Sequence, residues 1–427
     1  MSPRLLLGFL LLAASTTAHA QDKGAPALAG YVTRIGSPTD FDVNGIQILL
    51  GPNTKFQIMS KVGSKVEFSP ATVDDLALYL GEPIDIYGEA PRKTHTVAAT
   101  RIVLSPREPH PVNGEAIIDA VLPLPAGASP TDRLVRADGY PILLTAKTVL
   151  VFDKPLTTAA DIHVNVWILF HGSQRPDGIV VADDASFGKN LITHGEDMLR
   201  ESNEYDPAAV ASDKKQSALS KGFRGIDPKQ IPPYKDEAMQ ARVSAIGAKL
   251  VPKYQFDFPY TEETRIDFRF QVIDSTRWRD AVTLPNGIIL VPRQVVERMQ
   301  NDSQLATVLA DNIACALEKQ PLRGNAQGKE LTAANLAGDA GSLLVPGLGI
   351  ATSIATYAVA KRIIRLSEEQ SGRVSLSLLH DAGYDLDQAP IAWWLLAPKK
   401  PEDIKDITLP YRAAYLYQFR GQTWPPN

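Results

Sequence analysis

The sequence contains very little cysteine and no large excess of charge of either sign. Its 427 residues include one cysteine, Cys315, so the chain has no internal disulfide and its core depends on burial alone. Lysine and arginine number 44 against 48 aspartate and glutamate residues, a formal net charge of −4. Nucleic-acid partners favour a strongly basic face, so this balance argues against them.

The apolar run at the N-terminus is too short to span a bilayer comfortably. It extends from Leu5 to Ala14, follows the positive charge of Arg4, and precedes the small-x-small pattern Ala18-His19-Ala20. This arrangement is typical of a cleaved secretory signal, so residues 1–20 are predicted to be a signal peptide. We expect an exported protein, periplasmic or extracellular; a retained N-terminal anchor is the alternative.

A second stretch without charge, residues 340–360, has a length that would suit a membrane span. Pro346, Gly347 and Gly349 interrupt it, and its hydrophobicity is moderate. We interpret it as a core helical hairpin or a lid, with membrane association through residues 340–360 as the alternative.

Two segments of the N-terminal half carry the same β-hairpin pattern. Asn44-Gly45 and Asp138-Gly139 each lie between apolar residues suited to strands. Both dipeptides fit a two-residue type I′ turn, whose central positions need positive φ. The pattern therefore indicates an internal duplication.

The match between the two copies continues on both sides of the turn. Further equivalent pairs are Gly30 with Gly114, Thr54 with Thr148, Ile84–Gly88 with Ile168–Gly172, and Val97-Ala98 with Val181-Ala182. We predict two small β-barrels, residues 21–111 and 112–189, which resemble the OB-like repeats of bacterial envelope proteins. A spacer role, or binding of polysaccharide or protein, is open for them.

Residues 190–235 are polar, charged and rich in proline, which predicts a linker with one short helix. If this linker is the only connection, the two halves should be independent folding units.

From residue 236 the pattern changes to alternating helices and strands. Met239, Val243, Ile246 and Leu250 share one helix face. The alternation from Ile266 to Val272 predicts a strand, and Asn286-Gly287 predicts a turn into an apolar strand at Ile288–Val291. Asn301 is expected to cap the next helix, with Gln304 as its reciprocal partner.

This order of elements, with the helix Asp302-Ser303-Gln304-Leu305-Ala306-Thr307-Val308-Leu309-Ala310 and the later Ala382-Gly383-Tyr384-Asp385, resembles the catalytic domain of HtpX/BepA-type zinc metallopeptidases. The resemblance covers residues 236 to 394. It implies a zincin-like domain, residues 236–427, mainly helical with a small sheet. The fold class expected for the whole chain is α+β and multi-domain, with two small all-β barrels preceding that domain.

Where the resembled family reads His-Glu-x-x-His, this chain reads Asp311-Asn312-Ile313-Ala314-Cys315. Counting back thirteen residues from Gly383 places Gln370 at the family's third zinc ligand, a glutamate. An asparagine cannot act as the general base. Asp311 and Cys315 could each bind zinc, but two ligands do not make a catalytic site. The resemblance therefore implies a degenerate site, with no zinc expected and no catalytic residue intact.

The expected function is a non-catalytic, metallopeptidase-like protein that binds peptide or protein segments in the cell envelope. Zincins hold substrate as an added strand, and Ile288, Ile289, Leu290 and Val291 are the candidate edge. One alternative is an active zinc peptidase with Asp311, Cys315 and an unknown third ligand. Another is carbohydrate binding through the β-repeats.

Overall fold

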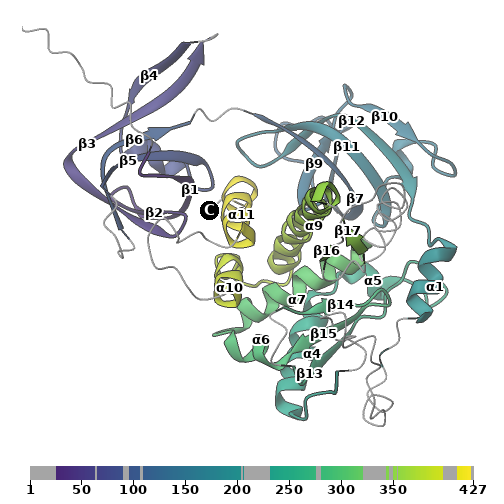
Figure 1. Cartoon of the computed structure of the whole chain (residues 1–427). Helices are drawn as coiled ribbons and strands as arrows, with labels where there is room; N and C mark the ends of the chain where they lie inside the picture. Colours follow the sequence, from purple (N-terminus) through teal and green to yellow (C-terminus); the bar gives the residue numbers. More distant parts are fainter. Residues whose placement is uncertain are drawn as a thin grey trace, which may run out of the picture.

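The computed structural model describes residues 26–62, 65–89, 96–105, 109–202, 205, 231–275, 280–320, 343–345, 350–352, 354–397 and 411–424. Side chains are described from residue 365 onward in the helix that begins at Ile354. The predicted signal peptide lies outside these ranges. The architecture is α+β, with two small barrels followed by a helical region that contains a small sheet (Figure 1). The predicted fold class is confirmed.

Each of the two barrels closes five strands and carries a sixth strand at its edge. In the first barrel the order is β2-β1-β5-β6-β3, β2 pairs with β3 to close it, and β4 extends from β3. The second has the order β12-β11-β7-β8-β9, is closed by β12 with β9, and carries β10 on β12. The first barrel contains β1 Leu28–Ser37, β2 Asp40–Val43, β3 Ile46–Val62, β4 Lys65–Ala71, a 3₁₀ turn at Asp74–Leu78, β5 Pro83–Glu89 and β6 Thr96–Leu104.

The second barrel repeats this topology. Its elements are β7 His110–Leu122, β8 Arg133–Ala137, β9 Tyr140–Leu144, β10 Val149–Phe152, a 3₁₀ turn at Ala159–Asp161, β11 Val166–Gln174 and β12 Val180–Lys189.

Hydrogen bonds show that the two barrels are equivalent in detail. Thr54 Oγ1 donates to the Ala99 carbonyl at 2.7 Å, and Thr148 Oγ1 donates to the Ala182 carbonyl at 2.8 Å. These bonds make Ala99 of the first barrel equivalent to Ala182 of the second. Ala98 is therefore equivalent to Val181, one position away from the match that the sequence suggests. The bulge after Tyr87 in β5 recurs after His171 in β11, and Gly88 then pairs with Ala99 as Gly172 pairs with Ala182. The one-residue difference between the copies therefore lies between these paired residues, in the chain that joins β5 to β6 and β11 to β12.

The predicted hairpin turns are present in both barrels. Asn44 and Asp138 have φ of 50° and 54°, and the glycines that follow them have φ of 74° and 75°. Positive φ at both central positions is what a type I′ turn requires, so the Asn-Gly and Asp-Gly dipeptides did identify these turns.

The helical region packs around a three-stranded sheet with the order β13-β15-β14. Helix α7 borders the β14 side of this sheet, and α9, α10 and α11 complete the core. The elements are α4 Glu237–Leu250, α5 Lys253–Asp257, β13 Arg269–Ile273, β14 Val282–Thr283, β15 Ile288–Pro292, α6 Arg293–Arg298, α7 Asp302–Leu317, β16 Leu343–Val345, β17 Ile350–Thr352, α9 Ile354–Asp381, α10 Gln388–Leu396 and α11 Tyr411–Thr423.

The expected peptide-binding edge is not an edge. Ile288, Ile289, Leu290 and Val291 belong to β15, which pairs in parallel with β13 and antiparallel with β14. All five residues of β15 are buried, as its unbroken apolar sequence requires of a strand covered on both faces. The prediction of a peptide-binding edge at these residues is therefore wrong.

Helix α11 lies between the two barrels (Figure 1). On one side its backbone lies very close to Gly81 of the first barrel. A Cβ on Gly81 would lie 2.5 Å from the carbonyl oxygen of Gln418 in α11. On the other side Thr423 accepts a hydrogen bond from Gln174, and Phe419 packs edge-to-face on Tyr140 with ring centroids 5.0 Å apart.

Two ion pairs join the second barrel to the helical region. Arg373 of α9 forms bonds of 2.6 Å from Nη2 to both carboxylate oxygens of Asp138, whose side chain is 2% exposed. Arg136 of β8 pairs with Asp119 at 2.8 Å and with Asp381 of α9 at 2.5 Å. The second barrel and the helical region thus share a buried interface, beyond the chain connection of the predicted linker.

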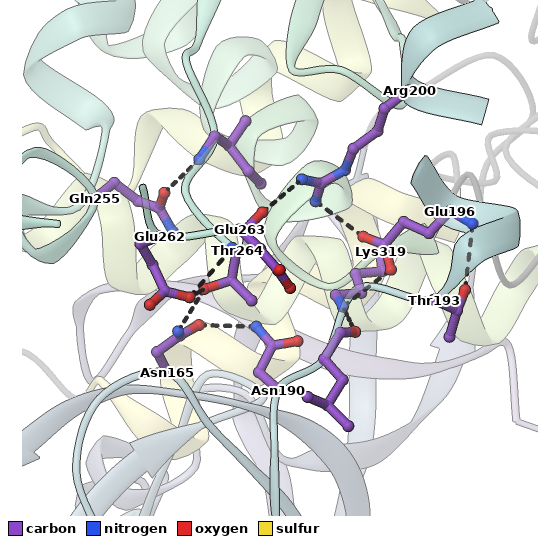
Figure 2. Close-up of polar contacts among 12 residues, drawn as sticks. Asn165, Asn190, Thr193, Glu196, Arg200, Gln255, Glu262, Glu263, Thr264 and Lys319 are labelled. Carbon is purple, nitrogen blue, oxygen red and sulfur yellow. Dashed lines mark hydrogen bonds and ion pairs between the residues drawn. The ribbon is translucent and has the colours of Figure 1, made fainter. Parts of the chain in front are cut away.

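The predicted linker, residues 190–235, contains the expected short helix, α1 His194–Ser202. Figure 2 shows that Glu196 of α1 bonds with both Arg200, at 2.9 Å, and Lys319, at 3.1 Å. Nearby, Asn165 donates to Thr264 at 2.8 Å. This network attaches α1 and the second barrel to the helical region.

Most of residues 340–360 fall outside the described ranges, apart from β16, β17 and the beginning of α9. Among the described helices, none combines the length and hydropathy that crossing a membrane would require.

Candidate functional site

Helix α7 positions the residues expected at the degenerate metal site. Its N-cap is Asn301, whose side-chain oxygen accepts a hydrogen bond from the Gln304 N–H at 2.9 Å, as predicted. Gln304 does not return that bond to Asn301; its side-chain oxygen accepts from the Gln300 N–H at 2.8 Å. Asp311, Asn312 and Ile313 are buried in the interior of this helix.

A salt bridge lies at Asp311. Nη2 of Arg412, from α11, is 2.5 Å from Asp311 Oδ2, and Nη1 donates to Asp280 Oδ2 at 2.9 Å. The guanidinium carbon lies 3.4 Å from the centroid of the Trp393 ring, in a cation–π contact. Burial lowers the pKa of Arg412, but Asp311 and Asp280 raise it by more, so the guanidinium remains charged.

Asn312, at the expected general-base position, is fully engaged in holding the helix against the sheet. The Thr283 hydroxyl of β14 lies 2.8 Å from Asn312 Oδ1, and Asn312 Nδ2 donates to the Val308 carbonyl at 2.9 Å. A neutral amide held in this way does not act as a proton acceptor. Its role in the structure is to tie α7 to the edge strand β14.

Cys315 lies one helical turn after Asp311. Burial raises the pKa of its thiol well above the ordinary value, and the negative charge of Asp311 adds to the rise. The Arg412 charge and a hydrogen bond with Ser371 of α9 act in the opposite direction without cancelling it. The thiol is therefore protonated at neutral pH, a state that neither binds zinc well nor acts as a nucleophile.

We expect Cys315 to react slowly with iodoacetamide. Because its pKa is raised, the thiolate fraction at pH 8 is small, and alkylation should be at least tenfold slower than in the urea-unfolded chain. The rate should increase as the pH rises above 9. Asp311→Asn removes the negative charge that favours the neutral thiol, so it should accelerate alkylation of the folded protein. Rapid alkylation of the natural chain at pH 7 would contradict this assignment.

Gln370 does not approach Asp311 or Cys315 through its side chain. Its Nε2 donates to the Glu115 carbonyl of the second barrel at 2.9 Å, and its Oε1 accepts a hydrogen bond from Gln320 at 3.3 Å. The resemblance to the metallopeptidases implies a third ligand at position 370, but this side chain lies on another face of α9.

The α9 residue that lies in the same charged group is Glu368. Burial raises the pKa of its carboxyl, Arg412 opposes that rise, and Asp311 and Asp280 add to it. Glu368 and Ser371 are three residues apart and so occupy one face of α9, the face directed toward α7. We refer to Asp280, Asp311, Cys315, Glu368 and Arg412 together as the α7–α9 charge cluster.

The residues of this cluster do not fit a zinc ion. The Arg412 guanidinium occupies the position beside Asp311, and a cation already present there would repel a second one. Among the described residues, no group of three histidine, cysteine, aspartate or glutamate side chains is arranged to hold a metal. Asp311 Oδ1 is buried without a hydrogen-bond partner in the described part of the chain, so Arg412 satisfies only half of this carboxylate.

Arg412 was not identified from the sequence. It lies about 100 residues beyond Asp311, in α11, and nothing in the local sequence links it to that residue. None of the known protein-family models matches the sequence, and a comparison with curated proteins finds no match.

Proposed function

We propose that this chain is an exported, non-catalytic protein whose metallopeptidase-like domain binds peptide or protein segments in the cell envelope without hydrolysing them. The observation that carries the proposal is the contact between Arg412 and Asp311, whose closest atoms are 2.5 Å apart. In a zincin the corresponding helix face holds a metal cation, and here a cationic side chain of the same protein takes that position.

The neighbouring groups support the loss of hydrolysis. Peptide hydrolysis by a zincin needs a metal-bound water and a carboxylate that takes its proton. Asn312 supplies an amide that is already bonded to Thr283, and Cys315 supplies a neutral thiol. Neither group can replace the missing base or the missing ligands.

Metal analysis tests the proposal directly. The mature protein, purified without chelators, should contain less than about 0.1 zinc per chain and should leave unfolded casein uncut, yet retain casein in a pull-down. Casein cleavage that depends on Asp311 and Cys315 and stops with a chelator would establish the alternative, an active peptidase with non-standard ligands. Binding of polysaccharide alone, with no peptide retained, would favour carbohydrate recognition through the barrels.

A further inference from the structure

A polar groove of about 540 Å³ lies between the second barrel and helices α9 and α11. Six consecutive residues of β7, from His110 to Glu115, form one wall. The opposite wall includes Glu369 and Arg373 of α9 with Tyr415 and Gln418 of α11. This volume is within the range of pockets that hold small ligands or short peptide segments, about 300–1,000 Å³.

The wall formed by β7 is a sheet edge. β7 pairs with β11 from His110 to Ile117, but it pairs with β8 only from Ile118 to Leu122. Among the described residues, no strand pairs with the other side of β7 at residues 110–117. A stretch of strand with one unpaired side can accept a further strand through its backbone groups.

The hydrogen bonds at the end of this stretch show which backbone groups face the groove. The Glu115 carbonyl accepts from Gln370, and the Ile117 N–H donates to Glu318 Oε2 at 3.3 Å, both on the side away from β11. Because the N–H and C=O of one strand residue point the same way and alternate along the strand, those of Asn113 also face away from β11. The Glu115 N–H and the Pro111 carbonyl face the groove for the same reason.

In the first barrel a turn residue bonds to the equivalent edge. There Asn44 Oδ1 accepts from the Tyr31 N–H at 2.9 Å, and the Asn44 N–H donates to the Tyr31 carbonyl at 2.9 Å. In the second barrel Asp138 takes the place of Asn44, and its carboxylate is bound by Arg373. Asp138 lies close to Gly114 as Asn44 lies close to Gly30, but the carboxylate of Asp138 is also bound by Arg373 of α9.

We propose that an extended peptide with basic side chains adds as a strand to β7 at residues 111–115 and lies in this groove. The charges select the partner: Asp138 pairs with Arg373 and Glu369 pairs with the exposed Arg365, which leaves the carboxylate of Glu115, hydrogen-bonded to the Trp167 indole N–H, to receive a basic side chain. This inference rests on the proposed peptide-binding function and assigns it to one place.

Hydrogen exchange on the full mature chain tests the strand addition without a mutation. The probe is a nonapeptide of alternating lysine and threonine. At saturation it should slow exchange of the Asn113 and Glu115 amides at least tenfold. The amides of Val112 and Gly114, which face β11, should change little. Equal protection of all four, or of none while the peptide is bound, would overturn the placement on β7.

A matched pair of variants gives the second test. Asn113→Pro removes the outward N–H and is tolerated where that N–H faces away from the ladder, so it should weaken peptide binding at least tenfold. Asn113→Ala keeps the N–H and should change affinity less than twofold. A nonapeptide of alternating glutamate and threonine should not bind.

The outcomes separate the two levels of the proposal. Tight peptide binding that Asn113→Pro leaves unchanged overturns the β7 site while the proposed function stands. No binding of either nonapeptide or of unfolded casein overturns both. Displacement of the basic peptide by a neutral oligosaccharide would assign the groove to sugars and overturn the inference.

Discussion

Replacing Arg412 with alanine should destabilise the folded protein by about 3–5 kcal/mol, the usual effect of removing one member of a buried ion pair. Asp311 is buried, and its Oδ1 already lacks a partner in the described part of the chain. Without the guanidinium, the buried carboxylate of Asp311 would lie near the partly buried carboxyl of Glu368 with no compensating cation. Urea denaturation of the two proteins at pH 7 measures the difference.

The pH dependence identifies the cause of this loss. Removal of the cation raises the folded-state pKa of Glu368 further above its unfolded value, near 4, because Arg412 is the charge that opposes the rise. The folded state then favours the protonated form, so the penalty is present at pH 7 and should shrink as the pH falls toward 4. A deficit that stays constant from pH 7 to pH 4 would instead indicate lost packing on Trp393.

Two further variants serve as controls. Lys253→Ala removes a cation from an exposed pair with Asp257 and should change stability by no more than about 0.5 kcal/mol. Arg412→Lys keeps the charge but loses the planar fork that bonds to Asp280 and Asp311 together, so it should recover only part of the stability. Full stability in Arg412→Ala would mean that the charge cluster does not hold α11 to α7.

The barrels were predictable because their signals are local. Asn44-Gly45 and Asp138-Gly139 require turns with positive φ, and the paired threonines Thr54 and Thr148 make the same bond in each copy. Helix α7 was predictable for the same reason, since its cap and its apolar residues lie within one continuous segment. Physical constraints that act over a few residues leave a readable pattern in the sequence.

The site was less predictable because its contacts cross the whole chain. Successive residues of a helix are turned by about 100° from each other, so an offset of two positions moves a side chain to nearly the opposite face. The position thirteen residues before Gly383 is Gln370, whereas the α9 residue near Asp311 is Glu368, two positions earlier and on a different face of the helix. The apolar sequence Ile288–Val291 predicts a strand but does not reveal which strands flank it, and its pairing partner β14 has only two residues.

A zinc site should be obtained by the combined change Asp311→His, Cys315→His and Arg412→Ala, with the natural Glu368 as third ligand. Residues 311 and 315 are one turn apart on α7, and removing Arg412 takes away both the repulsion and the group that fills the space. Zinc that binds only the folded state stabilises it by about 2.7 kcal/mol at a hundredfold excess over Kd. The melting temperature should therefore rise by about 5 °C or more when zinc is added.

Matched controls distinguish Glu368 from Gln370 as the third zinc ligand. Adding Glu368→Gln to the triple variant should abolish the zinc-dependent stabilisation, because an amide is a poor zinc ligand compared with a carboxylate. Adding Gln370→Glu should not increase it, since the side chain at position 370 contacts the second barrel at Glu115. Restored activity is not expected while Asn312 remains bonded to Thr283. If the triple variant folds but binds zinc no better than the natural chain, α7 and α9 do not present residues 311, 315 and 368 to a common point, and the resemblance to a metallopeptidase site fails with it.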